Sequence, residues 1–190
     1  MVSAIIMASG QSKRMGENKL LLPYKGKAII EHVLDKVISF NFRSIVVVYN
    51  HKEILEMCKD RKILAIYNDN SELGQSKAIK LGIENSPQSE GYVFFTGDQP
   101  LIDIETIELL LNEFNNNKSS IIVPNYKGRR GSPVIFSKYF KEELLNLSGD
   151  IGGRVIIEKN PSEIRFINVK DEFALWDIDT KEDYERLLEK

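Results

Sequence analysis

The chain has 190 residues, of which 42% are hydrophobic and 28% are charged, and its formal net charge at pH 7 is -2. This composition is ordinary for a globular protein and argues against a broad basic face for nucleic acid. The length suits one continuous core, so we expect a single domain over residues 1–190. We expect no membrane-spanning segment and no signal peptide. With a single cysteine, Cys58, the chain is expected to be cytoplasmic.

Apolar, β-branched runs alternate along the chain with segments of helical periodicity. Strands are expected over residues 4–7, 44–49, 63–67, 92–96, 120–124, 132–136 and 164–169. Helices are expected over residues 28–40, 52–59, 76–85, 103–114, 138–147, 151–158 and 180–189. This alternation predicts an α/β fold with a mostly parallel, doubly wound, Rossmann-like sheet. Ligands of such sheets bind at the carboxyl ends of the strands, near a switch in strand order.

The stretch IIMASGQSKRMGENK, from Ile5 to Lys19, carries the first motif. The first strand ends in small residues, which let a ligand approach the backbone closely, and successive N–H groups in such a turn can cradle an anion. Cationic side chains follow within the same loop. The spacing matches neither G-x-x-x-x-G-K-[ST] nor G-x-G-x-x-G. We interpret it as a triphosphate-binding loop rather than a plain basic surface loop, with contributions from Ala8, Ser9, Gly10, Ser12, Lys13, Arg14, Gly16 and Lys19.

The second motif is NDNSELGQS, which follows the third predicted strand and leads into a helix. The start of a helix offers free backbone N–H groups. Gln75 and Ser76 carry amide and hydroxyl groups that suit a base or ribose, and Gly74 precedes them. The alternative is an N-capping loop without a ligand.

Acidic residues make up the third and fourth motifs. Asp98, in TGDQP, follows the apolar run YVFFT, where a carboxylate is costly unless it is paired or bound to a metal ion. Because Mg²⁺ is commonly held by one or two carboxylates plus substrate phosphates, Asp98 is a candidate ligand. In WDIDT, Asp177 and Asp179 point the same way if the segment is extended, and either could complete the site; we expect Asp179. Their alternative role is a favourable interaction with the dipole of the last helix.

Two glycine-bearing segments with cations come later in the chain. PNYKGRRGSP, residues 124–133, could be an acceptor-binding segment or a basic hairpin turn. SGDIGGR, residues 148–154, could bind an acceptor through Gly149, Asp150 and Arg154, or be an Asp-capped helix start. Both segments suit an acceptor that carries a phosphate and a flat heterocycle.

In this order, MASGQSKRMGENKLLLP, LGQSKAIKLG, TGDQPLI, YKGRRGSPVIF, GDIGGR and DIDTKEDY resemble the molybdenum cofactor cytidylyltransferases and the related guanylyltransferases. The resemblance covers about residues 4 to 187. It implies the nucleotidyltransferase type of fold and transfer of CMP from CTP to the terminal phosphate of molybdenum-molybdopterin, with Mg²⁺ and release of pyrophosphate. It implies Arg14, Lys19 and Asp98 as catalytic residues, and it leaves room for a client molybdoenzyme as a partner.

The choice of nucleotide stays open at this point. Cytidylyltransferases of this family usually show Ala-Ala-Gly at the first turn and guanylyltransferases Ala-Gly-Gly, whereas this chain has Ala8-Ser9-Gly10. Ser9 is nearer to Ala in size, and LLLP together with GDIGGR favours CTP. The alternatives are a GTP-using enzyme, a cytidylyltransferase for another phosphorylated acceptor such as an isoprenoid or sugar phosphate, and a non-catalytic carrier or insertion factor for the cofactor.

Overall fold

The computed structural model describes residues 1–12 and 14–190. Its strands are β1 (Val2–Ala8), β2 (Pro23–Tyr24), β3 (Lys27–Ala28), β4 (Ile45–Tyr49), β5 (Leu64–Tyr67), β6 (Gly91–Thr96), β7 (Ile121–Tyr126), β8 (Arg129–Arg130), β9 (Val134–Ser137) and β10 (Ile164–Asn168). Its α-helices are α1 (Ile29–Ile38), α2 (Lys52–Asp60), α3 (Gln75–Glu84), α4 (Ile104–Asn116), α5 (Lys141–Leu145), α6 (Arg154–Lys159) and α7 (Lys181–Leu188). Of the helices so described, none is both long and apolar enough to span a membrane.

The central sheet has the strand order β10-β7-β9-β6-β1-β4-β5, and β8 pairs with β7 at one end. Strand β1 is parallel to both of its neighbours, β4 and β6, whereas β9 runs antiparallel to β6 and β7. The chain first builds outward from β1 through β4 to β5 and then returns to the other side of β1 with β6. This reversal is the expected switch in strand order, and it confirms the mostly parallel α/β fold predicted from the sequence.

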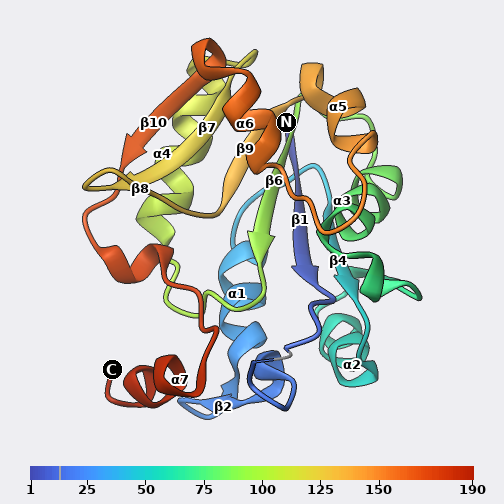
Figure 1. The fold of residues 1–190 in the computed structure, drawn as a ribbon, viewed down its shortest axis with the longest axis vertical. Helices are drawn as coiled ribbons and strands as arrows, with labels where there is room; N and C mark the ends of the chain where they lie inside the picture. The colour runs from blue at the N-terminus through green and yellow to red at the C-terminus, as the bar shows by residue number, and fades with distance from the viewer. Residues whose placement is uncertain (13) are drawn as a thin grey trace.

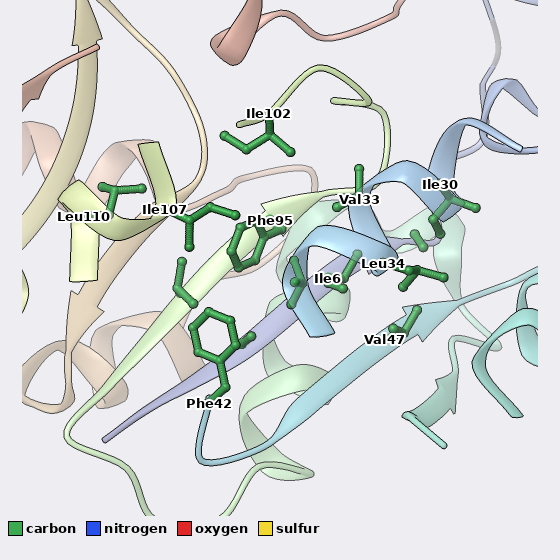
Figure 2. Packing of buried hydrophobic residues seen from close by; sticks show 14 of the residues in the cluster. Ile6, Ile30, Val33, Leu34, Phe42, Val47, Phe95, Ile102, Ile107 and Leu110 are labelled. Carbon is green, nitrogen blue, oxygen red and sulfur yellow. The ribbon is translucent and has the colours of Figure 1, made fainter. Parts of the chain in front are cut away.

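The core is split between the two faces of the sheet, because successive strand residues point to opposite sides. On one face, Ile6 and Phe95 pack with Val33 of α1 and with residues of α2 and α4 (Figure 2). On the other face, Ile5 and Phe94 pack with residues of α3, α5 and α6. Full burial of such a side chain stabilises the fold by about 1.5–3 kcal/mol. Both faces are therefore covered, which explains why the central strands read as continuous apolar runs.

The carboxyl ends of β1 and β6 meet at one end of the sheet. In Figure 1 these two strands run side by side with their arrowheads toward the part of the molecule where β2 and α7 lie. Helix α7 begins with a capping box in which the Thr180 hydroxyl accepts from the backbone N–H of Asp183, as the T-K-E-D sequence predicts. The segment just before this helix is thereby held beside the strand tips.

Two helices differ from the sequence prediction. The helix expected over residues 138–147 is a 3-10 turn at Lys138–Phe140 followed by the short α5. The helix expected over residues 151–158 begins only at Arg154, and Asp150 does not cap it. Two adjacent glycines at 152 and 153 disfavour a helical start, which agrees with their poor helix propensity.

Candidate active site

A cleft of about 1380 Å³ opens at the carboxyl ends of β1 and β6. Among the residues expected from the sequence, it is lined by Ser9, Gly10, Ser12, Arg14, Lys19, Gly74, Gln75, Asp98, Asp150, Arg154 and Asp179. Small-molecule pockets usually measure about 300–1000 Å³, so this cleft has room for two substrates. The motifs that the sequence scatters over about 170 positions therefore share one cavity.

Lys19 is at the centre of the charged groups in this cleft. Its Nζ lies 2.5 Å from Oδ2 of Asp98 and 2.7 Å from Oδ1 of Asp179. Lys19 begins a 3-10 turn whose N-cap, Asn18, accepts a hydrogen bond from the backbone N–H of Leu20. Burial alone would lower the pKa of Lys19, but the two carboxylates outweigh it and raise that pKa. Lys19 is therefore a fixed positive charge at the strand tips.

Arg14 also pairs with Asp179, from the solvent side of the cleft. Its guanidinium Nη2 donates to Oδ2 of Asp179 at 3.1 Å. Burial alone would raise the pKa of Asp179, but hydrogen bonds and charge from Lys19 and Arg14 lower it. Both carboxylate oxygens of Asp179 are thus already engaged by cations.

Asp177 lies deeper in the cleft than Asp179. It accepts a hydrogen bond from Thr96 at the end of β6, whose Oγ1 donates to Oδ1 of Asp177 at 3.3 Å. Burial, followed by the negative charges of Asp98 and Asp179, raises the pKa of Asp177 to about 7. Oδ1 of Asp98 is buried and has no hydrogen-bond partner among residues 1–12 and 14–190. An orphaned carboxylate oxygen beside a second buried carboxyl group is the environment that a divalent cation stabilises.

These contacts bear on the expected metal ligands. The sequence interpretation chose Asp179, but both oxygens of that carboxylate contact Lys19 or Arg14, whereas among residues 1–12 and 14–190 no cation forms an ion pair with Asp177. The donor set fits Asp98 with Asp177 better than Asp98 with Asp179. In the described part of the chain no group of three or more His, Cys, Asp or Glu residues could hold a metal ion, so two carboxylates would need oxygens from a substrate.

The loop after β1 is fixed by polar contacts beneath it. The Ser9 side chain is buried and its hydroxyl accepts from Nδ2 of Asn68 at 2.9 Å, while Nδ2 of Asn50 donates to the Ser9 carbonyl at 3.1 Å. No atom of the described residues lies within 4 Å of the place where a Cβ on Gly10 would be. The loop thus combines an anchored base with open space above its backbone, as a ligand-binding turn requires. Lys13, which the sequence interpretation included, lies outside the described residues.

The LGQS and GDIGG segments lie against each other. The backbone N–H of Gln75 donates to Oδ1 of Asp150 at 3.2 Å, and the Ser76 hydroxyl donates to the carbonyl of Gly149 at 2.7 Å. The free N–H groups expected at the start of α3 are therefore bonded within the chain. Ser76 is buried, so the nucleotide contact expected of its hydroxyl is not supported.

Four expected residues do not line the cleft: Ala8, Gly16, Ser76 and Gly149. Ala8 has no exposed surface and supports the loop from below. Gly16 and Gly149 adopt positive φ angles of 77° and 67° and serve the turns themselves.

Sequence reasoning gave no role to several side chains that do line the cleft. They are apolar or aromatic residues of the sheet strands together with one polar residue: Met7, Phe94, Thr96, Val123, Val134 and Phe136. Arg130, from the segment that the sequence interpretation considered for the acceptor, lines the cleft as well. The strand residues belong to runs that read as core, and only their place near the strand tips distinguishes them. Arg130 is on β8, whose pairing with β7 makes residues 121–130 the hairpin that was the alternative interpretation of this segment.

Comparisons with known proteins agree with this architecture. Residues 4–164 match the family model described as MobA-like NTP transferase domain. A probable molybdenum cofactor guanylyltransferase from Natranaerobius thermophilus is 34% identical over 141 residues, which are 74% of this chain and 67% of that protein.

Two solved structures show the same fold. A homologue of Mycobacterium tuberculosis Rv0371c, from Mycobacterium sp. strain JC1, aligns with a TM-score of 0.87 and 29% identity, covering 99% of this chain and 95% of that one. Rv0371c from Mycobacterium tuberculosis H37Rv, in complex with manganese, aligns with a TM-score of 0.82 and 22% identity over 100% and 98% of the two chains. This chain therefore belongs to the family of MobA-like NTP transferase domains and is a nucleotidyltransferase.

Proposed function

We propose that this enzyme transfers a nucleoside monophosphate from an NTP to the terminal phosphate of a molybdopterin-type acceptor that carries molybdenum, and releases pyrophosphate. The observation that carries the proposal is the joint position of Arg14, Lys19 and Asp98 at the tips of β1 and β6, in a cleft with room for two substrates. The probable molybdenum cofactor guanylyltransferase from Natranaerobius thermophilus supports this choice of acceptor.

The triphosphate is bound by the loop after β1. Backbone N–H groups near Gly10 cradle the β- and γ-phosphates, and Arg14 adds a planar, permanently charged donor. Lys19, deeper in the cleft, offsets the negative charge that builds on the α-phosphate. At 4 Å and an effective dielectric constant of 20, one such charge pair is worth about 4 kcal/mol. Positioning and charge stabilisation of this kind are the main contributions in phosphoryl transfer.

The acceptor phosphate is already anionic and needs no general base. One of its oxygens attacks the α-phosphorus in line, the bond to the β-phosphate oxygen breaks, and pyrophosphate leaves with that oxygen. Arg14 and the loop backbone hold the leaving group through the reaction.

Asp98 and Asp177 would hold the divalent cation, which we take to be Mg²⁺, through the orphaned Oδ1 of Asp98 and the buried carboxyl group of Asp177. Such a cation would neutralise negative charge on the substrate phosphates. Asp179 keeps Lys19 and Arg14 oriented toward the cleft instead of acting as a ligand.

The proposed acceptor side of the cleft carries two cations, Arg130 and Arg154. Arg binds a phosphate through its planar fork, so these residues suit a phosphorylated acceptor. Phe94 and Phe136 also line the cleft, but their rings are 5% and 2% exposed and belong to the core beneath it. The choice of a pterin-type acceptor over an isoprenoid therefore rests on the guanylyltransferase relative, and a carrier protein would have no reason to keep a triphosphate loop.

For the donor we favour CTP, because Ser9 at the first turn is closer in size to Ala than to Gly and is buried against Asn68. GTP is the second candidate, favoured by the guanylyltransferase relative. The base is read at this turn in either case.

The test is pyrophosphate release with each of the four NTPs, with and without molybdenum-loaded molybdopterin, in Mg²⁺. The proposal predicts release that requires the acceptor and is fastest with CTP; a GTP preference would correct the donor alone. Pyrophosphate release that is equally fast with and without the acceptor would contradict the proposed reaction. So would the absence of release with all four NTPs. Asp103→Ala, which removes the N-cap of α4 outside the cleft, is the matched control.

A further inference from the structure

The loop at residues 148–153 is attached to the start of α3 by a set of contacts that we call the clasp, made by residues 74–76 and 149–153. Gln75 N–H donates to Oδ1 of Asp150, and the backbone N–H of Ser76 approaches the carbonyl of Gly149 at 3.4 Å. The Ser76 hydroxyl donates to the same carbonyl at 2.7 Å. Asp150 thus caps a helix that is remote from it in sequence, since 75 positions separate the bonded pair.

Three glycines of these segments, Gly74, Gly152 and Gly153, lie where the two segments and β9 pack closely. Gly74 has φ +83°, and a Cβ there would clash with the backbone of Asp150. A Cβ on Gly152 would clash with Oε1 of Gln75, and one on Gly153 would come within 2.7 Å of Cζ of Phe136 on β9. These glycines allow two loops and a strand to pack closely, whereas Gly10 faces open space. The glycines of LGQS and GDIGG are therefore complementary parts of one contact.

The clasp also changes what the start of α3 can bind. A helix N-terminus attracts anions through its free N–H groups and its dipole. Here the carboxylate of Asp150 and the carbonyl of Gly149 already accept from the first two of these N–H groups, those of Gln75 and Ser76. This occupation is consistent with the loop after β1, rather than the start of α3, as the proposed site of the triphosphate. Immediately after the clasp, α6 begins at Arg154, so the clasp sets where this cation enters the cleft.

We propose that Asp150 is a positioning residue that contacts neither substrate's reacting groups: by capping α3, it holds residues 148–154 as a rigid wall of the acceptor side. This inference rests on the proposed function for the identity of the acceptor. The attachment of residues 148–154 to α3 does not depend on that identity, because it is made by contacts within the chain. Loosening this wall should raise the acceptor KM without weakening NTP binding.

The experiment compares Asp150→Ala with Asp150→Asn, since Asn keeps an oxygen acceptor for the Gln75 N–H while it removes the charge. Asp103→Ala is the control, because it also removes a carboxylate that caps a helix, α4, but leaves the clasp intact. Three quantities are measured for each protein: amide hydrogen exchange of residues 148–154 without substrate, the Kd of CTP and of GTP in Mg²⁺ by calorimetry, and the acceptor KM.

We expect Asp150→Ala to accelerate exchange in 148–154 and to raise the acceptor KM by about tenfold, the scale expected when a positioning contact is lost. NTP affinity should stay within about twofold of the parent, a change well below 1.4 kcal/mol. In Asp150→Asn, the exchange in residues 148–154 and the acceptor KM should both be close to those of the parent. Asp103→Ala should change neither quantity.

Two results would overturn the proposal. One is unchanged exchange in residues 148–154 of Asp150→Ala. The other is a loss of NTP affinity of about tenfold or more in Asp150→Ala, equivalent to about 1.4 kcal/mol, because Asp150 would then act on the nucleotide. If the parent transfers nothing to molybdopterin, the proposed function fails, and the exchange comparison alone decides whether Asp150 anchors the loop.

Discussion

Nζ of Lys19 lies 2.5 Å from Oδ2 of Asp98, so the loop after β1 and the tip of β6 are joined by an ion pair in which both side chains are largely buried, with 13% and 14% of their surface exposed. The cation proposed to stabilise the α-phosphate is therefore held, before substrate arrives, by the carboxylate proposed to bind the metal ion. In the proposed reaction the substrate phosphates would attract Lys19 while the cation would bind the free Oδ1 of Asp98, so both would weaken this pair. Three of the predictions below follow from this arrangement.

Replacing Asp98 with Ala should abolish turnover while the fold remains intact. The reason is that the orphaned Oδ1 of Asp98 is the principal proposed metal contact, whereas none of the hydrogen bonds that hold the sheet depends on this side chain. Turnover is measured as pyrophosphate release in Mg²⁺, and the fold is checked by circular dichroism and urea unfolding. Activity close to that of the parent would exclude Asp98 as a metal ligand.

Replacing Lys19 with Ala should slow the chemical step more than it weakens NTP binding. In the proposed reaction, Lys19 lies beside the α-phosphate, where charge grows, while Arg14 and the loop backbone hold the phosphates that leave; all of these groups line the cleft. Single-turnover rates at saturating NTP report the chemical step, and calorimetry reports binding. Equal single-turnover rates for the variant and the parent would remove Lys19 from the chemistry.

The stability of the metal-free protein should depend on the protonation of Asp177. Burial and the neighbouring charges of Asp98 and Asp179 raise the pKa of Asp177 from 3.8 to about 7. The folded protein then keeps a proton that the unfolded chain loses near pH 4, so the contribution of Asp177 is greatest below pH 4 and is lost as the pH rises through about 7. At about 1.4 kcal/mol for each tenfold change in proton affinity, this loss approaches 4 kcal/mol.

Asp177→Asn isolates this contribution, because Asn accepts the hydrogen bond from Thr96 without titrating. In EDTA, the Tm of Asp177→Asn relative to the parent should rise between pH 5 and pH 8. A Tm difference that stays constant over this range would show that Asp177 titrates normally in the folded protein.

Local patterns in the sequence were sufficient to predict the order of strands and helices and the meeting of the motifs at the strand tips. Continuous apolar runs identified β1, β4 and β6, and Lys19 and Asp98 had to approach each other once those strands were parallel neighbours. The antiparallel direction of β9 could not be predicted in this way, because strand direction depends on the path of the whole chain.

The details that sequence reasoning missed depend on side chains from distant segments. The late start of α6 reflects the close packing of Gly152 and Gly153 against Gln75 and Phe136. Our proposal of Asp177 rather than Asp179 as the second metal ligand depends on the contacts that Lys19 and Arg14 make with Asp179. Neither relationship has a local signature, although glycines in two polar motifs are a signal that the motifs could pack together.

Close packing of α3 on β1 gives a prediction about stability alone. A Cβ on Gly82 would clash with Cγ2 of Ile5 and come within 3.2 Å of its Cγ1. Ala in an exposed helix gains up to about 1 kcal/mol over Gly, but overpacking a core typically costs about 1–3 kcal/mol. We therefore expect Gly82→Ala to lower the free energy of unfolding by about 1 kcal/mol, measured in urea.

A double-mutant cycle with Ile5→Ala tests the cause. If the clash with Ile5 is responsible, the double variant should be more stable than the sum of the single changes by about 0.5 kcal/mol or more. Strict additivity would mean that another neighbour opposes the added methyl group.

The central claim is that the loop after β1 binds the triphosphate while Asp98 holds the cation that accompanies it. It is tested most directly by calorimetric titration of CTP and GTP into the parent and Asp98→Asn, each in Mg²⁺ and in EDTA. The account predicts that Mg²⁺ tightens binding to the parent by about tenfold or more, equivalent to about 1.4 kcal/mol, and that Asp98→Asn loses this gain. It also predicts that Asp98→Asn binds the metal-free nucleotide at least as tightly as the parent, because Lys19 then keeps only Asp179 as an anionic partner. An equal gain from Mg²⁺ in both proteins would contradict the account.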